Sequence, residues 1–343
     1  MQWSHYSQQA WALLSGVLRV LRERPIRTRL AGHPIAHIWI LQLLALSACA
    51  HDSAFQAARP AGTVAVRRVT KDLAEPAGRA LQLAKQDGPS AVLVVFDIDD
   101  TLLTMPQYLG SDAWFEWQSD LLSVPQQGDA IARDFAGLVD RQISLFQLST
   151  MTLTQPNAPA LVEQLQGADI AVLAVTARSP QARGSTLREL DRHSIDFSSF
   201  PDCGPPLCPR RGRISAQQID IALRSASLSL DGRPREISIA QGVMMLAGQN
   251  KAIMLKLLLE STAGLSFTHI LVIDDTPDNL DTYAAAAGSL NAALHLYEYR
   301  GAKQRDGNPA DTNQERTISQ RRSEQLEAAI CGSMASHWCR QPN

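Results

Sequence analysis

One stretch constrains the fold of this chain more than any other: the apolar run at residues 91–96, which ends in Asp97-Ile98-Asp99-Asp100-Thr101. Its unbroken apolar character after Gly88-Pro89 predicts a strand buried on both faces, as in parallel sheets covered by helices. Ligands bind at the carboxyl ends of such strands. Three carboxylates so close together repel one another unless a cation lies among them, so the stretch predicts a hard metal ion such as Mg²⁺. The alternative is a solvated acidic turn that caps a following helix.

Two later apolar runs also end in polar side chains, and a lysine opens a predicted helix before the second of them. These features are 170–175 with Thr176, 269–273 with Asp274 and Asp275, and Lys251 before a helix at 252–260. Together with the first strand they predict an α/β fold, a three-layer Rossmann-like parallel sheet, over residues 71–300. Each motif alone has a plainer explanation: Thr176 as a helix N-cap, Lys251 as a surface residue, and the paired aspartates as a turn.

Residues 105–167 separate the first two strands by more than a plain crossover needs. Helical periodicity there predicts a small inserted helical cap, and modules inserted above a strand end commonly close over a substrate. The cap is rich in aromatic residues. Trp114, Phe115 and Trp117 could stack on an aromatic leaving group, or they could form the core of the cap itself.

The N-terminal residues 1–49 have the pattern of an export signal. Five arginines and one acid precede an apolar segment at 38–48 that is too short to span a bilayer as a helix. Its end, Leu46-Ser47-Ala48-Cys49, resembles the bacterial lipobox, which implies lipidation of Cys49 and a membrane-anchored lipoprotein, with Ala50 pointing to the outer membrane and the periplasm. An uncleaved signal anchor with a buried Cys49 is the alternative. Residues 50–70 lack an apolar period and predict a tether.

The four remaining cysteines, Cys203, Cys208, Cys331 and Cys339, suit an oxidising compartment. An even number in two close pairs predicts disulfide bonds, of which 203–208 and 331–339 are the local choice. A zinc site is the alternative, although the usual short ligand spacing is lacking. The first pair lies in a predicted loop at about 201–240, and the second in a polar tail, 301–343, with a predicted helix at 313–330. The net charge of −2 gives no argument for a nucleic-acid partner.

Residues 90–298 resemble the haloacid dehalogenase superfamily of Mg²⁺-dependent phosphohydrolases, whose four motifs match in order. The matching residues are Asp97-Ile98-Asp99-Asp100-Thr101, Thr176, Lys251 and Asp274-Asp275. The segments at 96–101 and 176–180 are similar to those of secreted class B acid phosphatases. Gly110-Ser111-Asp112, Gly248-Gln249-Asn250-Lys251 and Ile273-Asp274-Asp275 resemble more closely an uncharacterised bacterial family of exported or outer-membrane proteins in the same superfamily.

The resemblance implies a role for each matching residue. Asp97 is the expected nucleophile, and Asp99 is the expected acid and base for the leaving oxygen and the attacking water. Thr176 and Lys251 are expected to bind the phosphoryl oxygens. The expected Mg²⁺ site consists of Asp97, the backbone carbonyl of Asp99, and Asp275, with Asp274 as its neighbour.

The expected function is therefore Mg²⁺-dependent hydrolysis of a small phosphorylated substrate in the cell envelope. One alternative is an envelope lipoprotein that keeps the fold for a binding or structural role, with little or no catalysis. Transfer of the phosphoryl group to an alcohol through the same intermediate is another. The presence of both carboxylates of the first motif favours catalysis.

Overall fold

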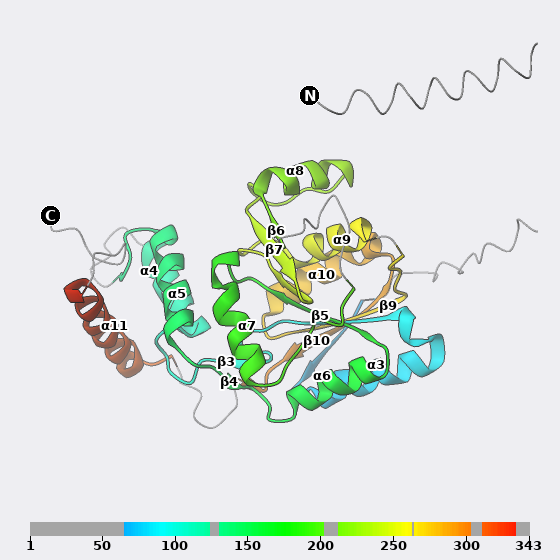
Figure 1. Cartoon of the computed structure of the whole chain (residues 1–343), viewed down its shortest axis with the longest axis horizontal. Helices are drawn as coiled ribbons and strands as arrows, with labels where there is room; N and C mark the ends of the chain where they lie inside the picture. Colours follow the sequence, from blue (N-terminus) through cyan, green and yellow to red (C-terminus); the bar gives the residue numbers. More distant parts are fainter. Residues whose placement is uncertain (1–64, 124–129, 202–211, 263, 303–310, 334–343) are drawn as a thin grey trace, which may run out of the picture. The chain divides into compact units, whose positions relative to one another are not determined.

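A computed structural model describes residues 65–123, 130–201, 212–262, 264–302 and 311–333. These residues contain an eight-stranded sheet in the order β1-β10-β9-β2-β5-β8-β7-β6 (Figure 1). The strands are β1 (Ala65–Thr70), β2 (Val92–Phe96), β5 (Ala171–Thr176), β6 (Arg213–Ile214), β7 (Ile237–Ala240), β8 (Val243–Met245), β9 (His269–Asp274) and β10 (Ala293–Tyr299). The six strands from β1 to β8 in this order run parallel, and β7 pairs antiparallel with both of its neighbours, β8 and β6. The predicted three-layer Rossmann-like α/β fold is confirmed.

Alternate side chains of the buried strand β2 point to opposite faces of the sheet. Val92, Val94 and Phe96 share one apolar core with α3 (Ala74–Asp87) and α6 (Ala158–Gly167). Leu93 and Val95 share a second core with α9 (Lys251–Ser261) and α10 (Pro277–Leu290). Both faces of the strand are therefore covered, which explains why its sequence is apolar without alternation.

The hairpin β7–β8 places a further parallel strand beside β5. Its two turn residues, Gln241 and Gly242, both have positive φ, as the common two-residue hairpin turn requires. A Cβ atom at Gly242 would overlap the backbone of Phe197, so only glycine fits there. Short runs of β-forming residues on either side of Gln241-Gly242 are the sequence signature of such a hairpin. The predicted loop at 201–240 is wrong for its later part, however, because residues 213–240 form β6, α8 (Ala216–Ser225) and β7.

The predicted tether at 50–70 is wrong for residues 65–70, which form the edge strand β1. Backbone pairing with β10 holds this strand, from Ala65 opposite Leu294 to Thr70 opposite Tyr299. Most of its side chains are exposed, so no apolar pattern marks it in the sequence. The signal segment 1–49, Cys49 and residues 50–64 lie outside the described residues. Among the helices that the structure describes, none has the length and apolar composition of a membrane-spanning segment.

The inserted cap starts and ends at a two-stranded sheet, in which β3 (Leu103–Thr104) pairs with β4 (Thr152–Leu153). Its helices α4 (Asp112–Ser123) and α5 (Phe135–Leu148) enclose the fully buried Trp114. Phe115 and Trp117 pack against the same apolar cluster. Trp114, Phe115 and Trp117 therefore contribute to the apolar core of the cap itself. The predicted cap boundary at 167 is wrong, since α6 packs on the sheet instead.

The predicted C-terminal helix is confirmed as α11 (Asn313–Ser333), and it packs against the cap. Its residues Leu326 and Ile330 contact the cap cluster around Trp114. The buried Arg141 of α5 forms an ion pair with the half-buried Glu327 of α11 at 3.2 Å. The 301–343 segment is therefore more than a polar tail. Cys331 is disulfide-bonded; Cys203, Cys208 and Cys339 lie outside the described residues, so both pairings stay predictions.

Candidate functional site

The carboxyl ends of β2 and β9 bring three aspartates together. The two strands are parallel neighbours, and the backbone N–H of Asp97 donates to the carbonyl of Ile273 at 2.9 Å. This register places Asp97 beside Asp274 and Asp275, which follow Ile273 directly. One carboxylate oxygen from each aspartate lies within 4.8 Å of the others, and all three residues are buried. Such a set of hard oxygen donors could hold a metal ion.

Lys251 supplies a positive charge at the centre of this cluster. Its Nζ lies 2.7 Å from Oδ1 of Asp97 and 2.7 Å from Oδ2 of Asp274, and the side chain is only 3% exposed. An ammonium that bridges two buried carboxylates fixes both of them and offsets part of their repulsion. The lysine, predicted from its place in the sequence to serve this site, therefore reaches it from α9.

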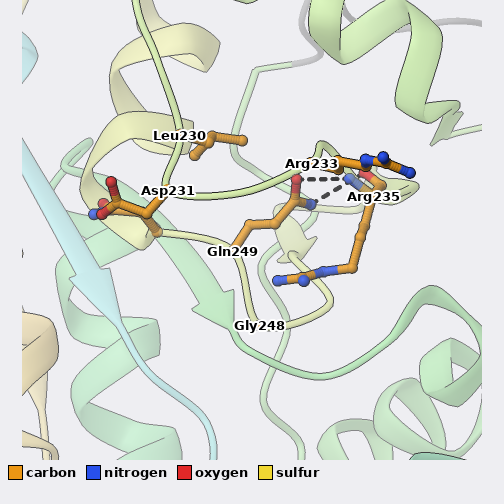
Figure 2. A pocket seen from close by; sticks show the side chains of 7 residues that line it. Leu230, Asp231, Arg233, Arg235, Gly248 and Gln249 are labelled. Atoms are coloured by element: carbon orange, nitrogen blue, oxygen red, sulfur yellow. Dashed lines mark hydrogen bonds between the residues drawn. The ribbon is translucent and has the colours of Figure 1, made fainter. Parts of the chain in front are cut away.

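The three residues before Lys251 explain how α9 presents it. The amide of Gln249 exchanges hydrogen bonds with the backbone of Arg235, accepting from its N–H at 2.9 Å and donating to its carbonyl at 3.1 Å (Figure 2). Asn250 caps α9 by accepting hydrogen bonds from the N–H groups of Ala252 and Ile253. Gly248 has a φ of +72°, which suits glycine in the preceding turn.

A cavity of about 240 Å³ borders this turn (Figure 2). It is lined by Leu230, Asp231, Arg233, Arg235, Gly248, Gln249 and Asn250. None of the three clustered aspartates is among its lining residues. The cavity therefore borders the segment that carries Lys251 without containing the carboxylates.

Asp274 is held by donors on all sides. Its Oδ1 accepts from the side chain of Asn279 at 2.9 Å and from the backbone N–H of Thr276 at 3.0 Å, and its Oδ2 accepts from Lys251. These bonds orient the carboxylate rigidly, which suits the role of a neighbour to the metal ligands. Asn279 was not predicted as a site residue, although it follows the fourth motif by only a few positions.

The buried carboxylates of the cluster raise the pKa values of both Asp97 and Lys251. Burial is the largest cause that raises the pKa of Asp97, and the charges of Asp274, Asp275 and Asp99 add to it; Lys251 only partly opposes them, so the pKa stands well above its usual range. Burial by itself would lower the pKa of Lys251, but the carboxylates of Asp274 and Asp97 outweigh it and raise the pKa. One ammonium does not balance these acids, so a divalent cation fits the cluster.

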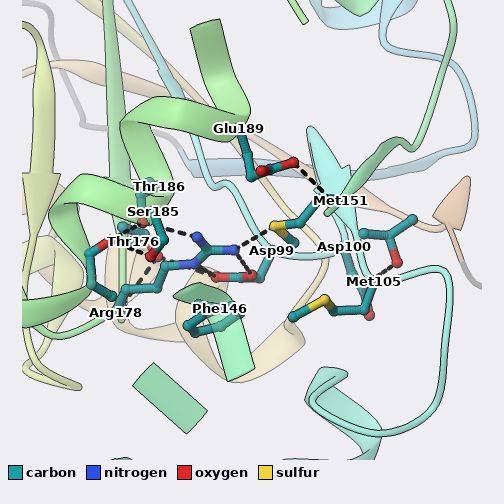
Figure 3. Close-up of polar contacts among 12 residues, drawn as sticks. Asp99, Asp100, Met105, Phe146, Met151, Thr176, Arg178, Ser185, Thr186 and Glu189 are labelled. Atoms are coloured by element: carbon teal, nitrogen blue, oxygen red, sulfur yellow. Dashed lines mark hydrogen bonds and ion pairs between the residues drawn. The ribbon is translucent and has the colours of Figure 1, made fainter. Parts of the chain in front are cut away.

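Asp99 lies beside the end of β5, where Thr176 and Arg178 meet it (Figure 3). The hydroxyl of Thr176 is 3.4 Å from Oδ2 of Asp99 and accepts a hydrogen bond from the backbone N–H of Arg178. Thr176 therefore shapes a turn after β5 rather than capping a helix. Arg178 grips Asp99 with two side-chain hydrogen bonds, of 2.8 and 2.6 Å. No role was predicted for Arg178, although it stands two positions after the second motif.

The remaining acids of the site have different surroundings. Asp100 adopts a left-handed backbone with a φ of +50° and accepts a hydrogen bond from Thr104, so it serves the turn after β2. Asp112 stands at the start of α4, and protein atoms crowd around it although part of its surface is exposed to solvent. Burial by that surrounding protein raises its pKa, and so do the charges of Asp99, Asp100, Asp275 and Asp97. The cap therefore contributes a further carboxylate within electrostatic reach of the strand ends.

Comparison with known families adds a classification. The family model described as "Protein of unknown function (DUF2608)" matches residues 75–328. The chain belongs to this family. The DUF2608 segment runs from α3 into α11 and so contains the cap and every candidate site residue between Asp97 and Asp275. No curated protein matches the chain.

Proposed function

We propose that this protein is a Mg²⁺-dependent phosphomonoester hydrolase of the haloacid dehalogenase type. One observation carries the proposal: Lys251 bridges Asp97 and Asp274 at the carboxyl ends of parallel strands, where Asp275 completes a buried oxygen-donor set. A nucleophilic carboxylate, a phosphate-binding lysine and a metal site are the parts that such a hydrolase requires. The sequence resemblance gives the same assignment independently of these distances.

The proposed reaction has two steps. In the first, an oxygen of Asp97 attacks the phosphorus and forms a P–O bond, while the bond to the leaving oxygen breaks and Asp99 donates a proton to that oxygen. In the second, Asp99 takes a proton from a water molecule, which attacks the phosphorus and releases Asp97 and inorganic phosphate. Lys251 and Thr176 bind the phosphoryl oxygens and stabilise their charge.

Mg²⁺ would be held by Asp97, Asp275 and the backbone carbonyl of Asp99, with Asp274 as the neighbour that orients Lys251. It would supply charge neutralisation for the transferring phosphoryl group. The geometry supports this assignment because Asp274 already has protein donors at both oxygens.

The proposed location is the periplasmic side of the outer membrane, with the protein anchored by a lipid on Cys49. This part rests on the sequence of residues 1–49 alone. Mass spectrometry of the mature N-terminus tests it. A lipid-modified cysteine as the first residue is expected, and an unmodified chain that retains residues 1–48 would contradict it.

Hydrolysis of p-nitrophenyl phosphate by the purified protein tests the activity. We expect release of p-nitrophenol with Mg²⁺, and loss of that release after chelation with EDTA, restored by adding Mg²⁺ back. A panel of phosphate esters then compares substrates at the same metal concentration. Absence of hydrolysis with Mg²⁺ for every ester would leave the binding or structural alternative as the better description.

Stabilisation by Mg²⁺ is expected to depend on pH. The raised pKa of Asp97 means that the metal-free folded protein binds this proton more tightly than the unfolded chain does. The contribution of Asp97 therefore disfavours the folded state as the pH rises above the usual range of a carboxyl, and Mg²⁺ relieves that cost by replacing the proton. We expect a larger Mg²⁺-induced rise in melting temperature at pH 8 than at pH 5.5, measured by differential scanning fluorimetry. An equal rise at both pH values would contradict the assignment of Asp97 as a ligand.

A further inference from the structure

The carboxylate of Asp99 is gripped at both oxygens by a single buried arginine (Figure 3). Nε of Arg178 donates to Oδ2 at 2.8 Å, and Nη2 donates to Oδ1 at 2.6 Å. The side chain of Arg178 is 3% exposed and that of Asp99 is 14% exposed. A two-point pair of this kind fixes the rotation of the carboxylate as well as its position, which a lysine could not do.

The guanidinium group is in turn held by residues of the core and of the cap. Its Nη1 donates to the hydroxyl of Thr186 in α7 (Arg183–Arg192) at 2.9 Å. Its Nη2 lies 2.9 Å from the sulfur of Met151, and its central carbon lies 3.9 Å from the ring centroid of Phe146. Phe146 belongs to the cap helix α5, and Met151 belongs to the segment that returns from α5 to β4. Two of the three supports therefore come from the cap side.

The end of α5 is itself fastened to α7. The guanidinium of Arg188 donates to the carbonyls of Phe146, Gln147 and Ser149 at 3.0, 3.1 and 2.9 Å. The carboxylate of Glu189 accepts a hydrogen bond from the backbone N–H of Met151 at 2.8 Å. The bonds from Arg188 satisfy the carbonyls of Phe146 and Gln147 in the last turn of α5, which have no partner within the helix, and the carbonyl of Ser149 directly after it. These bonds and the one to Glu189 also fix the ring and the sulfur that flank Arg178.

We propose that Arg178 is a positioning residue that couples the cap to Asp99. The C-terminal end of α5, held by α7, fixes the position of the guanidinium group. The guanidinium group in turn orients the carboxylate of Asp99, which donates the proton to the leaving oxygen. This inference rests on the proposed function. Displacing the C-terminal end of α5, or shortening Arg178, still allows Asp97 to attack the phosphorus. The carboxylate of Asp99, however, is no longer oriented toward the leaving oxygen. The loss should therefore be greatest for substrates whose leaving group needs a proton.

The test compares two esters in the same protein sample. p-Nitrophenolate departs readily without a proton, whereas the phenolate of phenyl phosphate depends far more on one. We expect the ratio of kcat/KM for p-nitrophenyl phosphate to that for phenyl phosphate to rise about 10- to 100-fold in Arg178→Met, a partial loss of the roughly 10²- to 10⁴-fold that general acid catalysis typically contributes. Arg178→Lys keeps the charge without the two-point grip and should also raise the ratio. Because both rates come from one sample, a partly unfolded fraction cancels.

Phe146→Leu tests the connection to the cap, since it removes the ring face from Arg178 and keeps an apolar side chain. We expect this variant to raise the ratio in the same direction, by about 3-fold or more, as a partial loss of the same effect. Arg224→Met is the control, because the side chain of Arg224 is 73% exposed and its ion-pair partner, Asp220, lies on the same helix α8; this variant should leave the ratio at its wild-type value.

The outcomes separate this inference from the proposed function. An active wild-type protein with an unchanged ratio in Arg178→Met and Arg178→Lys overturns the inference and leaves the proposed function intact. A change in the arginine variants without one in Phe146→Leu overturns the link to the cap. A wild-type protein that hydrolyses no ester of the panel with Mg²⁺ overturns both.

Discussion

Asp97→Asn should abolish phosphatase activity, with kcat falling by at least about 10³-fold, because an amide cannot form the covalent intermediate. The substitution keeps the size of the side chain and one oxygen that can accept from Lys251. The measurement is the rate of p-nitrophenol release at saturating Mg²⁺. Trapping of phosphate on the wild-type protein, followed by mass spectrometry of the peptide that contains residue 97, should show a modification that Asp97→Asn lacks.

The folded state of Asp97→Asn should survive the change. A buried carboxylate whose pKa is raised costs free energy in its charged form, so an amide at this position removes a cost in the metal-free protein. We expect the free energy of unfolding in EDTA at pH 8 to equal or exceed that of the wild type. Retention of full activity in this folded variant would contradict the role of Asp97 as the nucleophile.

Lys251→Met should produce the largest loss of stability among the site variants. The substitution leaves the carboxylates of Asp97 and Asp274 buried without the ammonium that bridges them at 2.7 Å. Removing one partner of a buried ion pair typically costs about 3–5 kcal/mol. We expect a decrease of that size in the free energy of unfolding, measured by urea denaturation in EDTA at pH 8. Mg²⁺ should restore part of the loss, because the ion offsets the same charges and stabilises the state that binds it.

A second lysine of α9 provides the control for this experiment. Lys256 pairs with Glu260 at 2.5 Å and donates to the carbonyl of Ser289, away from the carboxylates. Lys256→Met should change the free energy of unfolding by no more than about 1 kcal/mol, as is usual for partly exposed pairs. Similar losses in both variants, or a loss in Lys251→Met that Mg²⁺ leaves untouched, would show that the cluster is not a cation site.

The sequence was sufficient to predict the centre of the fold and the members of the carboxylate cluster. Each of β2, β5 and β9 is an apolar run that stops at a polar side chain, and strands buried on both faces leave this signature. Lys251 alone also fits a surface position, and its role was predicted from the order of the motifs and the family resemblance that they carry. The structure brings Lys251 to Asp97 and Asp274, and it brings Thr176 to Asp99, as expected from parallel strands that end at one edge.

What the sequence did not predict depends on contacts between distant residues or on backbone pairing. Arg178 grips a carboxylate 79 positions earlier, and Arg141 pairs with a glutamate 186 positions later, so neither partner is marked locally. The edge strand β1 has mostly exposed side chains, and only pairing with β10 defines it. Helix α8 is short, and its few buried residues follow a segment rich in proline and glycine that favours a loop prediction.

The cap joins segments that lie far apart along the chain, since α4 and α5 share their apolar cluster with α11. During synthesis the first two helices emerge well before the third. Until α11 has been synthesised, the apolar surface of the cap that later contacts Leu326 and Ile330 is exposed to solvent, and Arg141 has no Glu327 to pair with. The sheet can therefore fold before the cap is complete. A nascent polypeptide that stops before residue 311 would contain the acidic strand ends and the helices α4 and α5, but it would lack α11.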